Sequence, residues 1–251
     1  MLSGQEHRSR IMHKRWTDGA RATERYRRAI VQFSRPGLRV LHAGCGWDLN
    51  AVSAPLVPTC RVIGIDLDAG ALARYHSPRA CATLAVIPFP DSSFDLVLCE
   101  YVIEHLDDPL GAFQEIARVL RPNGRLLGLT PNAWSYKGVG AMWTPQWFHE
   151  TMGRLRYGPG HEKDMYPTLY GCNTASRLKH TLSQAGFVNI TVNFINNGPT
   201  WFAKLPGLFA LGNLYHILLD RFESLRSLRC ALLVEAVRQD SFLAPLSGSS
   251  R

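Results

Sequence analysis

Segments typical of buried β-strands alternate with amphipathic helical segments along most of this chain. Runs of apolar residues predict strands over residues 38–41, 60–68, 92–100, 124–132, 188–195 and 230–239. Helical spacing of apolar residues predicts helices over residues 109–120 and 173–187. This alternation is typical of an α/β fold, in which helices cover both faces of a mainly parallel sheet and ligands bind at the carboxyl ends of the strands.

The first predicted strand runs into the stretch VLHAGCGWD, residues Val40 to Asp48, which contains two glycines. A phosphate-binding P-loop is excluded, because nothing after Gly44 supplies the lysine that it needs. The pattern of a dinucleotide site is incomplete, since Leu49 stands in place of the third glycine. The turn therefore suits a ligand that touches the backbone but carries no pyrophosphate.

Asp66 lies 22 residues after Gly44, at the end of the second predicted strand. A carboxylate at this place can accept hydrogen bonds from both hydroxyls of a ribose. Together with the incomplete dinucleotide turn, it favours an adenosine-type cofactor without phosphates. Two simpler alternatives stay open, in which the glycines only turn the chain and Asp66 only caps the next helix.

A longer block follows at residues Ile87 to Asn132, IPFPDSSFDLVLCEYVIEHLDDPLGAFQEIARVLRPNGRLLGLTPN. Together with VLHAGCG and VIGID, it closely resembles the class I S-adenosylmethionine-dependent methyltransferases, in particular the small-molecule group that contains ubiquinone, menaquinone and sterol methyltransferases. The resemblance is strong over residues 40–132 and weaker over 173–239. It implies a Rossmann-like three-layer sandwich with a seven-stranded, mostly parallel sheet, whose last strand is an antiparallel edge strand. S-adenosylmethionine would lie over the ends of the first strands.

The resemblance also implies which residues bind the cofactor. They are His42, Ala43, Gly44, Cys45, Gly46, Asp66, Leu67, Thr83, Leu84, Cys99 and Glu100. The loop from His42 to Gly46 would lie under the methionine moiety, Asp66 would hold the ribose, and Leu67 would pack on the adenine. Cys99 and Glu100 would lie beside the amino acid part of the cofactor. The family usually has an acid at His42 and at Thr83, so we expect weakened rather than abolished binding, because each neutral side chain can accept one hydrogen bond.

Methyl transfer from a sulfonium is an in-line displacement of an already activated group, so it requires neither a metal nor a covalent intermediate. An oxygen or nitrogen acceptor can need a general base, and the candidates are His105, His149 and His161. Certain ubiquinone O-methyltransferases carry a glutamate three residues before a Glu-His pair and hold a divalent cation there. Tyr101 stands at that position in this chain, so we predict no metal site.

The connection over residues 133–172 is unusually long, and such loops in compact domains tend to be functional. It holds eight of the 25 aromatic residues of the chain, Trp134, Tyr136, Trp143, Trp147, Phe148, Tyr157, Tyr166 and Tyr170. We expect a substrate cap with an apolar or aromatic pocket, the alternative being a satellite core. The predicted function is methyl transfer to a small hydrophobic or aromatic metabolite, at oxygen.

Three other functions compete with this one. Leu49 in place of the third glycine disfavours a nicotinamide-dependent oxidoreductase. A nucleic-acid methyltransferase would carry the signature Asp/Asn-Pro-Pro-Tyr/Phe at the end of the fourth strand, where CEYV stands instead. A non-catalytic scaffold with the same fold stays open, because His42 and Thr83 lack the usual charge.

The formal charge of +8 is concentrated at the amino end, where the first 35 residues hold nine Lys or Arg against three acids. Ala22, Tyr26, Ile30 and Phe33 recur at helical spacing, which predicts an amphipathic helix with a solvated basic face. Attraction to an anionic substrate or to a membrane surface stays open, whereas no nucleic-acid motif accompanies the charge. We divide the chain into a basic helical cap (1–35), the cofactor-binding domain (36–240) and a flexible tail (241–251).

The six cysteines show no C-x-x-C spacing, which disfavours a zinc site and a disulfide framework and indicates a reducing, cytoplasmic compartment. No apolar run follows the basic residues at the amino end, so we expect no secretory signal. The most apolar later segment, 205–219, is too short to span a bilayer. We predict a core helix there, with contact to a membrane surface or to an apolar pocket as the alternatives.

Overall fold

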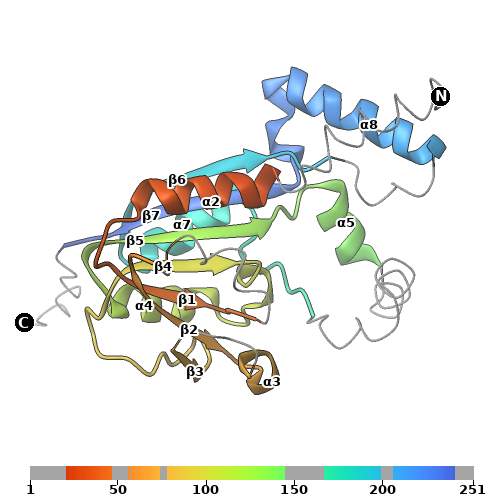
Figure 1. The fold of residues 1–251 in the computed structure, drawn as a ribbon. Helices are drawn as coiled ribbons and strands as arrows, with labels where there is room; N and C mark the ends of the chain where they lie inside the picture. Colours follow the sequence, from red (N-terminus) through yellow and green to blue (C-terminus); the bar gives the residue numbers. More distant parts are fainter. Residues whose placement is uncertain are drawn as a thin grey trace, which may run out of the picture.

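The computed structural model describes residues 21–46, 56, 58–73, 78–144, 167–198 and 206–240. A seven-stranded sheet lies between helices that cover both of its faces (Figure 1). The predicted α/β three-layer class is therefore confirmed. Residues 1–20 of the predicted amino-terminal cap, residues 145–166 of the predicted substrate cap and the tail over 241–251 lie outside the described residues.

The strands of the sheet are β1 (Arg39–Ala43), β2 (Arg61–Asp66), β3 (Arg79–Cys81), β4 (Phe94–Glu100), β5 (Leu120–Pro131), β6 (Phe187–Ile195) and β7 (Ala231–Arg238). Their order is β3-β2-β1-β4-β5-β7-β6. Strand β7 is antiparallel to both of its neighbours, and the other paired strands are parallel. The short strand β3 was not predicted from the sequence, because its residues RAC form no apolar run.

The last strand is antiparallel, as predicted, but its expected place at the edge of the sheet is wrong. Strand β7 lies between β5 and β6, and β6 forms the edge. The burial of the two strands gives the reason. The apolar residues of β7 are mostly buried, whereas β6 alternates between exposed and half-buried side chains, which an edge strand tolerates.

The helices are α2 (Arg21–Phe33), α3 (Ala69–Leu72), α4 (Pro109–Val119), α5 (Tyr136–Trp143), α7 (Ala175–Gln184) and α8 (Pro206–Arg221), with short 3-10 helices η2 (Ile103–His105) and η5 (Glu223–Leu228). Helix α2 packs on one face of the sheet, and α4 and α7 pack on the other (Figure 1). The amphipathic character predicted for α2 is confirmed, because Ala22, Tyr26 and Ile30 are fully buried while Arg25 and Arg28 are exposed.

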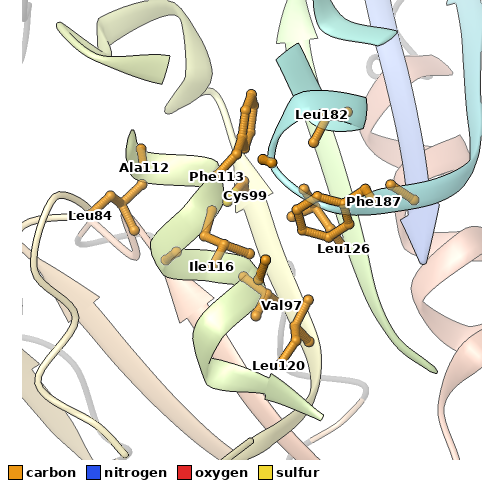
Figure 2. Packing of buried hydrophobic residues seen from close by; sticks show 14 of the residues in the cluster. Leu84, Val97, Cys99, Ala112, Phe113, Ile116, Leu120, Leu126, Leu182 and Phe187 are labelled. Atoms are coloured by element: carbon orange, nitrogen blue, oxygen red, sulfur yellow. The ribbon is translucent and has the colours of Figure 1, made fainter. Parts of the chain in front are cut away.

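Strand β4 lies at the centre of the sheet and connects the two cores. Leu96 and Leu98 pack on the side of α2, whereas Val97 and Cys99 pack on the side of α4 and α7. Figure 2 shows Val97 and Cys99 close to the side chains of α4. Burial on both faces explains why this strand is an almost continuous apolar run, as is typical of a central parallel strand.

The helix predicted over 205–219 forms as α8, but its predicted role as a core helix is wrong. Four of its leucine and isoleucine side chains are at least 40% exposed, namely Leu211, Leu214, Ile217 and Leu218. Helix α8 follows the carboxyl end of β6 and extends beyond the sheet, so the two cores do not reach most of its surface (Figure 1). None of the described helices is both long and apolar enough to cross a bilayer.

Candidate active site

The turn after β1 is tight because both of its glycines adopt left-handed backbone conformations. Gly44 has a φ of +67° and Gly46 a φ of +54°. A Cβ atom on Gly44 would lie 2.2 Å from a methyl carbon of Val102, whereas a Cβ on Gly46 would meet nothing within 4 Å. The turn therefore packs against Val102 at its first glycine and leaves space over its second.

Asp66, the last residue of β2, is tied to this turn. Its Oδ2 accepts a hydrogen bond from the backbone N–H of Gly46 at 2.6 Å, and its Oδ1 accepts one from the N–H of Asp68 at 2.9 Å. Asp68, and not Asp66, accepts the N–H of Gly70 in the first turn of α3, so the alternative that Asp66 only caps the helix does not describe its bonds. Each Asp66 oxygen keeps a second lone pair for a ligand.

The sheet register brings three of the predicted regions together. Ala43 of β1 is opposite Ile65 of β2 on one side and Cys99 of β4 on the other. The glycine turn, Asp66 and Glu100 therefore follow one another across the carboxyl ends of three adjacent parallel strands. Ligands of open α/β sheets bind at this edge.

His42 lies in β1 and is buried, with 3% of its surface exposed. Burial lowers the pKa of its imidazole to about 3, so the ring is neutral at physiological pH. Its Nδ1 has no hydrogen-bond partner within the described part of the chain. A buried polar atom without a partner is uncommon in native proteins, and it leaves this nitrogen able to bond with a ligand.

The side chains of the remaining predicted cofactor residues differ in their exposure to solvent. Leu67 is 69% exposed, which suits a residue that packs on a bound ring. Thr83 uses its Oγ1 to accept the N–H of Ala85 at 3.2 Å. The side chains of Leu84 and Cys99 pack in the core on the side of α4, so only their backbone can face a ligand (Figure 2).

Comparison with known proteins identifies the domain. Residues 41–128 match a family model described as a methyltransferase domain. A probable S-adenosylmethionine-dependent methyltransferase of Mycobacterium tuberculosis (strain ATCC 25618 / H37Rv) is 33% identical over 184 residues, which cover 69% of this chain and 59% of the relative. The malonyl-[acyl-carrier protein] O-methyltransferase of Hahella chejuensis is 34% identical over 110 residues, which cover 39% of each protein. The chain thus spans less than two thirds of the length of these relatives.

Solved structures share the fold. A methyltransferase from Thermotoga maritima superposes with a TM-score of 0.56 at 16% identity, covering 92% of this chain and 97% of the other. The phosphoethanolamine N-methyltransferase 2 of Haemonchus contortus, in complex with S-adenosylmethionine, superposes with a TM-score of 0.55 at 18% identity, covering 85% and 52%. This chain belongs to the class I S-adenosylmethionine-dependent methyltransferases.

S-adenosylmethionine is the cofactor of this family, and the site of this methyltransferase fits it. The cofactor has no phosphate, in agreement with a turn that lacks a lysine and a third glycine. The open space at Gly46 admits a ligand close to the backbone, and the partnerless His42 nitrogen and the fixed Asp66 carboxylate supply polar contacts. Methionine and ribose groups offer partners of the matching chemistry.

The structure describes one of the three candidate bases. His105 is half-buried in η2, and its Nδ1 lies 2.8 Å from the carbonyl oxygen of Pro167. His149 and His161 lie outside the described residues. Within the described ranges, no group of three His, Cys, Asp or Glu side chains is arranged to hold a metal ion.

Glu104, the acid of the Glu-His pair, has a structural role whose bonding partners were not predicted from the sequence. Its side chain is buried, and its carboxylate accepts a hydrogen bond from Thr130 Oγ1 at 2.9 Å. Thr130 in turn accepts one from the side-chain amide of Asn173 at 2.6 Å. The backbone oxygen of Glu104 accepts the N–H of Leu169 at 2.7 Å. Glu104 therefore connects η2 and β5 to the end of the predicted substrate cap. The only sequence signal was an acid next to a histidine.

Burial raises the pKa of Glu104 from 4.5 to about 7, which predicts how stability depends on pH. A carboxyl with a raised pKa stabilises the fold fully below its unfolded pKa of 4.5, and this contribution is lost as the pH rises through about 7. His42 has the opposite effect, since its contribution is full above 6.5 and is lost as the pH falls through about 3. Between pH 4.5 and 6.5, a rise in pH therefore lowers the stability through Glu104 and raises it through His42.

Glu104→Gln is therefore expected to raise the free energy of unfolding above pH 7, by up to roughly 3 kcal/mol. Denaturant unfolding measured across the pH range checks this. Wild type should lose stability through neutral pH more steeply than the variant. Equal slopes in the two proteins would contradict a raised pKa at Glu104. His105→Gln, which changes the neighbouring residue in the same 3-10 helix, serves as the matched control.

Proposed function

We propose that this chain transfers a methyl group from S-adenosylmethionine to an oxygen of a small hydrophobic or aromatic metabolite. The observation that carries the proposal is the Asp66 carboxylate, fixed beside an open glycine turn at the carboxyl edge of a class I methyltransferase sheet. The Hahella relative is named an O-methyltransferase and the Haemonchus structure an N-methyltransferase, so these names support the reaction class and leave the oxygen to experiment.

The cofactor supplies a methyl group that is already activated, so the protein has to align it with the acceptor. Asp66 accepts hydrogen bonds from the ribose and fixes the position of the cofactor along β2. The neutral His42 forms a hydrogen bond to the cofactor without adding a charge. Alignment of this kind contributes on the order of 7–11 kcal/mol to lowering the barrier.

His105 is the general base of the proposal, and its hydrogen bond to Pro167 supports that role. A carbonyl oxygen only accepts hydrogen bonds, so Nδ1 of His105 carries the hydrogen in the bonded pair. In the neutral ring Nε2 then has the lone pair that can take a proton from a hydroxyl acceptor. The backbone of Pro167 thereby sets the tautomer that a base requires.

The described part of the predicted substrate cap supports an apolar acceptor. Trp134 is 62% exposed and Trp143, at the end of α5, is 84% exposed. Both residues follow the carboxyl end of β5, at the same edge of the sheet as Asp66. Exposed indole rings at the cofactor edge are suited to stack on an aromatic or hydrophobic substrate.

The test is incubation of the protein with methyl-labelled S-adenosylmethionine and a metabolite extract, followed by mass spectrometry. We expect a labelled product with a mass increment at an oxygen, and loss of that product with Asp66→Ala. With His105→Gln, turnover should fall while calorimetric cofactor affinity stays unchanged. If the protein binds the cofactor but forms no labelled product across a broad extract, the proposal is wrong and the scaffold function is favoured. A label on nitrogen or carbon would overturn the choice of oxygen.

A further inference from the structure

Helix α8 exposes four leucine and isoleucine side chains, whereas its polar residues Asn213 and His216 are buried. Leu211 is 64% exposed, Leu214 54% and Leu218 40%, and Phe222, directly after the helix, is 50% exposed. They recur three or four residues apart, which places them on one stripe. We name Leu211, Leu214, Leu218 and Phe222 the α8 stripe. An exposed apolar stripe of this length marks an interaction site.

The polar face of α8 is held by specific hydrogen bonds. Asn213 and His216 are buried. The side-chain amide of Asn196, at the end of β6, donates to the backbone oxygen of His216 at 2.9 Å and to the Asp220 carboxylate at 3.0 Å. Tyr136 of α5 packs edge-on against His216, with ring centroids 5.7 Å apart. These contacts set the rotation of the helix, so the outward direction of the α8 stripe is built into the fold.

The charged residues at the end of α8 and around the neighbouring cavity are four arginines and two acids, a surplus of positive charge that favours an anionic partner. No Asp, Glu, Lys or Arg occurs between Pro206 and Leu219. The exposed residues Asp220, Arg221, Glu223 and Arg226 follow, and Glu223 pairs with Arg226 at 3.6 Å and with Arg229 at 2.7 Å. A cavity of about 260 Å³ beside the end of the helix is lined by Arg25, Phe194, Ile195, Asn196, Asp220 and Arg229. The chain as a whole carries +8. An uncharged apolar stripe next to basic residues is typical of helices that lie in the surface of an anionic bilayer.

Two exposed tryptophans, which the proposed function places beside the acceptor, also lie near α8. Trp134 and Trp143 flank α5, the helix on which α8 packs. Tryptophan is enriched where proteins meet the membrane–water interface. Helix α8 has 16 residues and does not meet the requirements for a span, so it would lie along a bilayer instead of crossing it.

We infer that α8 docks this protein on the surface of an anionic phospholipid bilayer, with the α8 stripe among the acyl chains and the neighbouring arginines at the phosphates. Helices α5 and α8 follow the carboxyl ends of β5 and β6. Docking through α8 therefore brings the edge of the sheet that carries the candidate active site close to the membrane (Figure 1).

The test is co-sedimentation of the full chain with phosphatidylcholine vesicles, with and without phosphatidylglycerol, in the absence of cofactor and acceptor. Wild type should bind the anionic vesicles and dissociate as salt rises. Leu218→Glu should weaken binding by roughly tenfold or more, because a charge replaces an apolar side chain that the bilayer would cover. Val31→Glu is the matched control, since Val31 is an exposed apolar residue of α2 with 55% exposure, and it should bind almost as wild type does.

Thermal unfolding of each variant verifies that it is folded, and Leu211→Glu, at the most exposed position of the stripe, is the second variant. Three results would overturn the inference. They are no binding of wild type to anionic vesicles, wild-type binding by both stripe variants, and a wild-type dimer that Leu218→Glu converts to a monomer. The last result would assign the stripe to a second copy of the chain. None of these measurements depends on methyl transfer, so failure here leaves the proposed function untouched.

Discussion

Asp66→Ala is expected to weaken S-adenosylmethionine binding by about 1–3 kcal/mol, or roughly 5- to 150-fold, because charge-assisted hydrogen bonds to the ribose are lost. The carboxylate is also held by the backbone of Gly46 and Asp68, so part of the loss comes from a turn that is no longer fixed. Isothermal titration calorimetry gives the dissociation constant. Asp66→Asn, which keeps one acceptor oxygen, should fall between wild type and Asp66→Ala.

Asp95 provides a matched control at the opposite edge of the sheet. Its Oδ2 accepts the backbone N–H of Arg39 at 2.8 Å, much as Asp66 accepts that of Gly46 at 2.6 Å. Each aspartate thus ties the backbone of β1 or its turn, Asp95 at the amino end and Asp66 at the carboxyl end. Asp95→Ala should cost stability without changing cofactor affinity. If both variants bind the cofactor equally well, the assignment of Asp66 to the ribose is wrong.

Gly44→Ala is expected to destabilise the fold by about 2–5 kcal/mol. The methyl group would lie 2.2 Å from a carbon of the Val102 side chain, at a φ of +67° that alanine rarely adopts. Overpacking costs about 1–3 kcal/mol and the left-handed conformation about 1–2 kcal/mol. Urea denaturation measures the loss, and cofactor binding should fall with it because the turn has to move.

Gly46→Ala separates the cost of overpacking from the cost of the left-handed backbone. Its methyl group meets nothing within 4 Å, so only the φ of +54° is unfavourable. It should therefore destabilise by about 1–2 kcal/mol. Val102→Ala combined with Gly44→Ala should recover part of the loss, since the clashing methyl groups are removed. Equal destabilisation by Gly44→Ala and Gly46→Ala would show that the contact with Val102 is not the cause.

The regular elements around the cofactor edge could be predicted from the sequence because their signals are local. The strand before Gly44, the strand before Asp66 and the helix from Pro109 each have a continuous apolar run or a helical period, and the structure places them within a few residues of the prediction. Strand β3 has no such pattern, since RAC becomes a strand only by pairing with β2. Its existence depends on a neighbour that is remote in sequence.

The position of β7 and the burial of Glu104 depended on long-range contacts in the same way. An antiparallel strand can pair with one neighbour or with two, and the sequence does not tell which. The strand pairing of the structure shows that β7 lies between β5 and β6. Glu104 follows β4 in the chain, but its partner Thr130 lies 26 residues further on. A local pattern cannot reveal such a partner, so the rise of its pKa to about 7 could not be inferred either.

The sequence by itself determined the class of fold, the order of its elements and the edge of the sheet that carries the candidate site, because periodicity and two glycines act through neighbouring residues. Only the tertiary structure decided which face of α8 points toward the protein. Its apolar composition favoured a core helix, yet Asn213 and His216 are buried, Asn196 bonds the helix beside them, and Leu211, Leu214 and Leu218 are exposed. Burial is a property of the packed chain, so the hydrophobicity of a segment does not tell which of its faces meets the protein.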